Sequence, residues 1–124
     1  MGFGEAIKTV YGKYADFNGR AGRAEYWWWF LYYILGLAAC ALVGQAIGAE
    51  DLLTGLFALA NLLPNLAVGA RRLHDRGMTA WLLLIMLIPV IGGLILLIFF
   101  ALEGEAGANR FGPDPRGAAA DPAP

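Results

Sequence analysis

Cysteine, histidine and charge are all scarce in this sequence. Its 124 residues include one cysteine, one histidine and only 15% charged residues. A single cysteine, Cys40, excludes an intramolecular disulfide, and with one histidine it leaves too few ligands for a zinc site. No phosphate-binding glycine loop, dinucleotide fingerprint or zinc-protease motif is present. The sequence therefore predicts no cofactor, no metal and no familiar catalytic site.

Apolar residues, in contrast, make up 59% of the chain, whereas a soluble domain usually has about 45–50%. The excess lies in three uncharged runs at 26–48, 52–70 and 80–102. As helices they would be about 28 to 34 Å long, against a hydrocarbon core of about 30 Å. We therefore expect an all-α membrane protein with three transmembrane helices in one domain, residues 1–116. Residues 117–124 are expected to be a disordered tail, and nucleic-acid binding is excluded.

The basic residues alternate along the chain. The four segments outside the apolar runs carry 4, 0, 3 and 2 lysines and arginines in chain order. Because short loops rich in these residues stay in the cytoplasm, the N-terminus and the 71–79 connection are predicted inside. The loop at 49–51 and the C-terminal tail are then predicted outside, with the tail arginines as the weakest part of the assignment. All four tryptophans fall at the predicted inner interface, where an aromatic belt is typical.

Residues before the first run predict a short amphipathic helix, 3–17. Phe3, Ile7, Val10, Tyr14 and Phe17 recur at steps of three and four, which places them on one helix face. That face either contacts acyl chains in the membrane interface or packs on the inner ends of the spans. Both alternatives keep the helix at the inner surface.

Small residues recur every four positions in the first run, at Gly36, Cys40, Gly44 and Gly48. Such a face lets another helix approach closely. It predicts a packing surface within the bundle or between copies of the chain.

The second and third runs each contain features that interrupt a plain apolar helix. Asn61 and Asn65 share a face beside Pro64, and they are expected either to join helices or to line a polar cavity. Pro89, Gly92 and Gly93 predict a kink in the third span. A re-entrant hairpin is the alternative, and it would return the tail to the inner side.

Several sequence segments together resemble a known family. They are 17–27, with Gly19-Arg20, Arg23 and Glu25-Tyr26-Trp27; Arg71-Arg72-Leu73-His74-Asp75-x-Gly77 with Trp81; Ile88-Pro89-x-Ile91-Gly92; and Asn109-Arg110-Phe111-Gly112-x-Asp114-Pro115. In order and spacing they are similar to the YhaH-like bacterial inner-membrane family, domain of unknown function 805, over residues 3–115. The resemblance implies a short multi-pass inner-membrane protein with a cytoplasmic N-terminus. It implies no established activity, cofactor or catalytic residue.

The chemically varied residues are a basic group at the predicted inner face: Arg20, Arg23, Arg71, Arg72, His74 and Arg76. Guanidinium groups at headgroup level suit phosphate, because each presents a bidentate fork. They are therefore a candidate site for lipid phosphate. The alternatives are that they only set orientation and pair with acids such as Asp75, or that His74 performs acid–base chemistry with Asp75 orienting it.

These observations favour a non-enzymatic inner-membrane protein whose cytoplasmic face engages anionic lipid headgroups. Its helices would remain available for self-association or for a membrane-protein partner. The first alternative is a transporter or channel component with a polar path at Asn61 and Asn65. The second is an enzyme acting on lipid-linked phosphate at residues 71–75.

Overall fold

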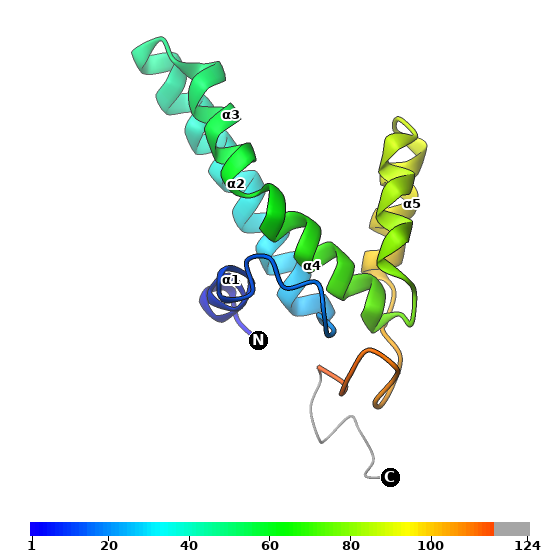
Figure 1. The fold of residues 1–124 in the computed structure, drawn as a ribbon. Coiled ribbons are helices and arrows are strands. Elements are labelled where there is room, and N and C mark those ends of the chain that lie inside the picture. Colours follow the sequence, from blue (N-terminus) through cyan, green and yellow to red (C-terminus); the bar gives the residue numbers. More distant parts are fainter. Residues whose placement is uncertain (116–124) are drawn as a thin grey trace.

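The computed structural model describes residues 1–115. Within them the chain is helical, and Figure 1 shows two arms that diverge from a common base. The elements in order are α1 (Phe3–Gly12), α2 (Arg23–Ile47), α3 (Glu50–Ala60), α4 (Leu62–Asp75), η1 (Ala80–Leu87, a 3₁₀-helix) and α5 (Ile91–Ala101). The expected disordered tail, 117–124, lies outside the described residues.

We use two terms for the ends of the molecule. The basal end holds α1, the start of α2, the end of α4 and segment 102–115, and the distal end is the turn between α2 and α3 (Figure 1). Among the described residues, α2 alone is long and apolar enough to cross a membrane. The α3–α4 pair, bent by 44°, counts as a second crossing if it is one span. The helical class is thus as expected, and two of the three predicted crossings have a counterpart.

The α2–α3 hairpin contains most of the predicted small-residue face. Gly48 ends α2 in the left-handed conformation with φ of 73°, which glycine adopts without a steric penalty. α3 then runs back along α2. Gly36 lies under the Phe57 ring, and Gly44 lies against the backbone of Glu50, where a Cβ would collide. Cys40, between them, is half-buried. The contacts at Gly36 and Gly44 show that this face packs closely within the chain.

The third apolar run folds back on itself instead of crossing in one helix. Arg72, just before the run, donates to the carbonyl oxygens of Phe100 and Leu102 at its end. A Cβ on Gly92 would overlap the Ile85 carbonyl oxygen, so the end of η1 and the start of α5 touch near the bend. The predicted single span at 80–102 is therefore wrong, and the re-entrant alternative describes the segment. Its physical cause is the break at 88–90, where Pro89 lacks an amide donor and Val90 has φ of 65°.

The reversal between η1 and α5, called the η1–α5 hairpin below, also changes where the C-terminal segment lies. Because η1 leaves the base and α5 returns to it, segment 102–115 emerges beside the end of α4, where the Glu105 amide donates to the Asp75 carbonyl (Figure 1). Residues 102–115 therefore lie at the same end of the molecule as the 71–79 connection, whereas the charge counts predict the tail on the opposite side of the membrane. Charge counts alone could not reveal this, because they assumed that every long apolar run crosses.

The amphipathic helix is shorter than expected and packs on the other helices. α1 ends at Gly12, so the predicted end at residue 17 is wrong; a turn and a bend follow before α2. Ala6 and Val10 are fully buried, while Phe3 and Tyr14 remain exposed. Of the two alternatives, packing against the spans accounts for the centre of the apolar face, although its ends stay open to the surroundings.

The apolar core sits at the basal end, where α2, α4 and α5 meet. Its buried members include Tyr26, Trp29, Val68, Leu73, Leu96 and Phe100. Gly69 allows Leu83 and Phe100 to approach α4 closely. This core fixes the start of α2 and the ends of α4 and α5 side by side, and so positions the polar residues below it.

Candidate functional site

Asp75 is the centre of a buried polar cluster at the basal end. Its Oδ1 accepts a hydrogen bond of 2.9 Å from Nε of Arg20, and its Oδ2 accepts one of 2.6 Å from Nη1 of Arg72. Asp75 is 4% exposed, Arg20 6% and Arg72 0%. One carboxylate therefore pairs with two guanidinium groups, from Arg20 and from Arg72, which are 52 positions apart in the sequence.

Glycine positions bring this cluster together. α4 ends at Asp75, and two residues later the φ of 74° at Gly77 allows the amides of Gly77 and Met78 to cap the carbonyls of His74 and Leu73. After α5, Gly104 passes so close to Asp75 that a Cβ would overlap its carboxylate. The next amide, of Glu105, donates 2.7 Å to the Asp75 carbonyl. Close approach of the backbone thus defines the site.

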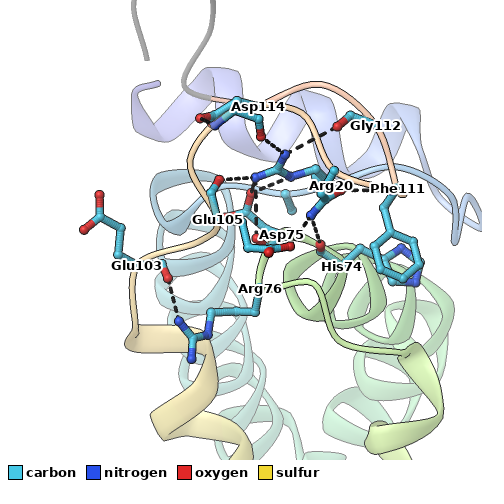
Figure 2. A network of polar contacts seen from close by, with 12 residues as sticks. Arg20, His74, Asp75, Arg76, Glu103, Glu105, Phe111, Gly112 and Asp114 are labelled. Carbon is cyan, nitrogen blue, oxygen red and sulfur yellow. Dashed lines mark hydrogen bonds and ion pairs between the residues drawn. The ribbon is translucent and has the colours of Figure 1, made fainter. Parts of the chain in front are cut away.

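The arginines of the cluster bind the C-terminal segment (Figure 2). Arg20 Nη1 and Nη2 each donate 2.5 Å, to the carbonyl oxygens of Gly107 and Glu105 respectively. Arg72 Nε donates 2.9 Å to the carbonyl of Phe100. Guanidinium donors from the N-terminal region and from α4 therefore hold the segment that follows the re-entrant hairpin.

Arg71 forms a separate buried ion pair. Its Nη1 lies 2.5 Å from Oε2 of Glu25, in the first turn of α2, and its carbonyl accepts 2.9 Å from the amide of Ala21. Arg71 is 0% exposed, and within residues 1–115 its Nε and Nη2 have no hydrogen-bond partner. Glu25 is thus the carboxylate partner that the structure gives to this buried charge.

His74 is held by backbone and aromatic contacts. Its Nδ1 is 2.9 Å from the Gly19 carbonyl, so Nδ1 carries the proton because a carbonyl oxygen only accepts. Its ring stacks on Phe111 with centroids 3.9 Å apart, and its own carbonyl accepts from Asn109. Asp75 contacts the two arginines, so the expected orientation of His74 by Asp75 is wrong.

The six predicted basic-site residues therefore divide into two groups. Arg20, Arg71, Arg72 and His74 are buried and bonded to groups of this chain. Arg23 is exposed, and Arg76 is half-buried with Nη1 donating 2.7 Å to the Glu103 carbonyl. The arrangement corresponds to the alternative of structural ion pairs, because the buried arginines have no free fork facing the surface.

The two intramembrane asparagines bond to aromatic side chains. Asn61 Oδ1 accepts 2.7 Å from the Tyr11 hydroxyl, and Asn65 Oδ1 accepts 2.7 Å from Trp29 Nε1. Burial raises the pKa of the Tyr11 hydroxyl above its ordinary value, and the hydrogen bond with Tyr32 raises it further by a smaller amount. The hydroxyl therefore stays a neutral donor. These bonds join α1 to the α3–α4 junction and α2 to α4, as the helix-joining interpretation expects.

Sequence reasoning did not assign a role to several residues of the site. Glu25 and Asp114 are 5% and 4% exposed, and Asp114 accepts 2.9 Å from the Gly107 amide (Figure 2). Asn109 bridges His74 and Glu105. All of them lie within the segments that carried the family resemblance. That grouping was the available signal, but it does not tell which residues meet in space.

Catalytic and metal chemistry find little support in the arrangement. In the described part of the chain, no three His, Cys, Asp or Glu side chains are grouped so that they could hold a metal ion. His74 is occupied by Gly19 and Phe111, and its neighbour Asp75 is paired with arginines. What the cluster can do chemically is join three chain segments through charge-assisted hydrogen bonds.

Comparison with known proteins assigns the chain to a family. Residues 14–113 match the family model described as "Protein of unknown function (DUF805)". The chain belongs to the DUF805 family. The inner membrane protein YhaH of Escherichia coli K12 is 44% identical over 108 residues, which cover 83% of this chain and 89% of YhaH. The family resemblance is thereby confirmed.

Two further relatives of the DUF805 chain come from the same organism. The inner membrane protein YhaI is 40% identical over 109 residues, covering 87% of this chain and 92% of YhaI. The uncharacterized protein YiiR is 32% identical over 126 residues, which cover 80% of this chain and 85% of YiiR. No solved structure matches the chain. Neither relative's name indicates catalysis.

Proposed function

We propose that this DUF805 protein is a non-enzymatic component of the bacterial inner membrane whose basal end contacts anionic lipid headgroups. The names of YhaH and YhaI support the location. The contacts would be made by exposed bases of the basal end rather than by the buried arginines. The buried cluster then serves to hold the surface that bears those bases.

The distribution of bases supports a cytoplasmic basal end. Every lysine and arginine except Arg116, which lies outside the described residues, belongs to the basal end, whereas the distal turn carries Glu50 and Asp51. Lysine and arginine counts in short loops govern orientation. Because the η1–α5 hairpin returns Arg110 to the basal end, this arginine no longer opposes the assignment of the basal end to the cytoplasm. The N-terminus and segment 102–115 would then both be cytoplasmic.

The single observation that carries the lipid proposal is the surface of the basal end. The bases exposed there among residues 1–115 are Lys8, Lys13, Arg23 and Arg110. Large aromatic side chains exposed at the same end are Phe3, Tyr11, Tyr14, Phe17, Trp28 and Trp81. Bases beside interfacial aromatic rings are typical of a surface at the headgroup level of an anionic leaflet.

Lipid retention by the purified protein tests the proposal. We would purify the chain in mild detergent with phosphatidylglycerol or phosphatidylcholine, and count bound lipids by native mass spectrometry. A triple variant, Lys8→Gln, Lys13→Gln and Arg23→Gln, should lose most of its preference for phosphatidylglycerol. Each base near an anionic surface contributes about 1 kcal/mol, so the combined loss is up to about two orders of magnitude.

A charge change at the distal turn is the matched control. The double variant Glu50→Gln and Asp51→Asn alters two exposed charges far from the basal end and should retain the preference. Equal phosphatidylglycerol preference in wild type and the triple variant would contradict the proposal. A rise in preference in the double variant that mirrors the loss in the triple variant would show that retention follows overall charge, and would also contradict the proposal.

A further inference from the structure

The described helices are distributed unequally through the depth of the membrane. α2 has 25 residues and is about 37 Å long, enough to cross the hydrocarbon core. η1 has 8 residues and α5 has 11, so each arm of the hairpin is only about 16 Å long. The hairpin leaves the base with η1 and returns to it with α5 (Figure 1). Within residues 1–115, the basal half therefore contains α2, α4, η1 and α5, whereas the distal half contains α2 and α3.

The tip of the hairpin is apolar on all sides. Leu87 is 80% exposed, Val90 76% and Ile91 61%. In a membrane such a tip remains in the hydrocarbon, because neither the headgroups nor the water beyond them would solvate it. The hairpin therefore displaces acyl chains from the basal leaflet while leaving most of the distal leaflet undisturbed.

α1 adds to the same leaflet. Figure 1 shows it lying across the lower part of α2 rather than along it. Its buried residues Ala6 and Val10 fix it to the bundle, while Phe3 and Lys8 are exposed. An amphipathic helix at the interface occupies area among the headgroups of one leaflet, and its binding is sensitive to curvature.

We propose that this protein is a membrane wedge that prefers, and stabilises, a bilayer that bulges toward the basal end. Two additional helices of about 10–12 Å diameter add about 150–220 Å² of cross-section to the basal leaflet, before α1 is counted. In a curved bilayer, the leaflet on the convex side has a larger surface area than the leaflet on the concave side. A protein with a larger basal cross-section fits there with less distortion of the lipids. The inference requires insertion in a membrane but not anionic headgroups.

Orientation in vesicles of different size tests the wedge. A fluorescent, chemically quenchable label is placed at the exposed position 106 by Ala106→Cys in a Cys40→Ala chain. The labelled protein is reconstituted into phosphatidylcholine, either as small sonicated or as large extruded vesicles. An impermeant quencher then reports the fraction of basal ends that face outward. The ratio of outward to inward basal ends should rise severalfold from large to small vesicles, because the outer leaflet of a small vesicle is strongly convex.

Two adjacent glycines provide matched variants. A Cβ at Gly92 would overlap the Ile85 carbonyl oxygen, so Gly92→Ala should open the hairpin and weaken the dependence on vesicle size. A Cβ at Gly93 meets no atom within 4 Å, so Gly93→Ala should behave as wild type. Circular dichroism in the vesicles confirms that both variants remain helical.

Each outcome for the wild-type chain bears on the inference. An outward fraction that is the same in small and large vesicles would overturn it, whatever the variants do. A basal end that turns inward in small vesicles would overturn it as well, since the wedge would then widen distally. Because the lipid is zwitterionic, none of these results depends on the proposed preference for anionic headgroups.

Discussion

The basal and distal ends of this molecule are stabilised by different interactions. At the basal end Arg20, Arg72 and Asp75 are buried together, and their donors are used on carboxylate and carbonyl oxygens. Toward the distal end α2 and α3 expose leucines such as Leu42, at 69%, and Leu52, at 61%. Helices surrounded by lipid gain little from burying apolar surface, so close packing at small residues replaces the hydrophobic effect there. The basal end instead depends on paired charges, and substitutions should therefore act differently at the two ends.

Removing the central carboxylate should have the largest effect. Asp75→Asn leaves Arg20 and Arg72 buried without the carboxylate that pairs with both. Breaking a buried ion pair by changing one partner typically costs about 3–5 kcal/mol. We expect that loss in the free energy of unfolding, measured by denaturation in detergent.

The distal turn provides the control for this comparison. Asp51 is exposed, and Asp51→Asn should change the free energy of unfolding by no more than about 0.5 kcal/mol. Similar effects of Asp75→Asn and Asp51→Asn would mean that the basal cluster does not contribute more than a surface charge. That result would remove the distinction between the two ends.

Packing at the distal end should respond to added volume. A Cβ at Gly44 would collide with the backbone of Glu50, so Gly44→Ala should cost about 1–3 kcal/mol by overpacking. Gly55 lies on α3 with no atom within 4 Å of an added Cβ. Gly55→Ala should be neutral or stabilise the helix by up to about 1 kcal/mol. Thermal unfolding of both variants in the same detergent distinguishes the two sites.

The polar bonds between helices should have the smallest effect. Asn65→Leu removes the acceptor for Trp29, and such bonds in membranes contribute about 0.6 kcal/mol on average. The double variant Asn61→Leu and Asn65→Leu should lower stability slightly without changing the permeability of reconstituted vesicles to small solutes. A solute flux in wild type that disappears in the double variant would instead favour the transport hypothesis.

The sequence predicted the helical class and the location of the spans better than their connectivity. The apolar runs marked α2 and the α3–α4 pair, and the spacing of Gly36 and Gly44 marked the face where α3 packs. The break at Pro89 was also visible. Whether it makes a kink or a reversal depends on contacts at the base, where Arg72 binds the carbonyls after α5. Those partners are about 30 residues apart, and no local pattern encodes them.

For the basic site, the sequence likewise indicated which residues lie in one region but not which groups they contact. The charge pattern placed Arg20, Arg71 and Arg72 at one predicted inner face with Asp75 as an ion-pair partner, and these residues do lie in one region of the basal end. Composition suggested a phosphate site, because it counts arginines but does not show their partners. Burial depends on Gly104 bringing the C-terminal segment against Asp75, and on Glu25 turning toward Arg71. Only the arrangement in space reveals that the acids and carbonyls use these donors.

The third apolar run forms a hairpin that returns segment 102–115 to the end of the molecule where α1 lies. Side-specific cysteine labelling in intact cells and inverted membranes tests it most directly, in a Cys40→Ala chain. The three probes are Glu5→Cys in α1, Ala49→Cys at the distal turn and Ala106→Cys after α5, and all three positions lie outside the apolar runs. Ala106→Cys should react from the same side as Glu5→Cys and from the side opposite to Ala49→Cys. Reaction of Ala106→Cys from the same side as Ala49→Cys would show that the run crosses the membrane, and would contradict the account.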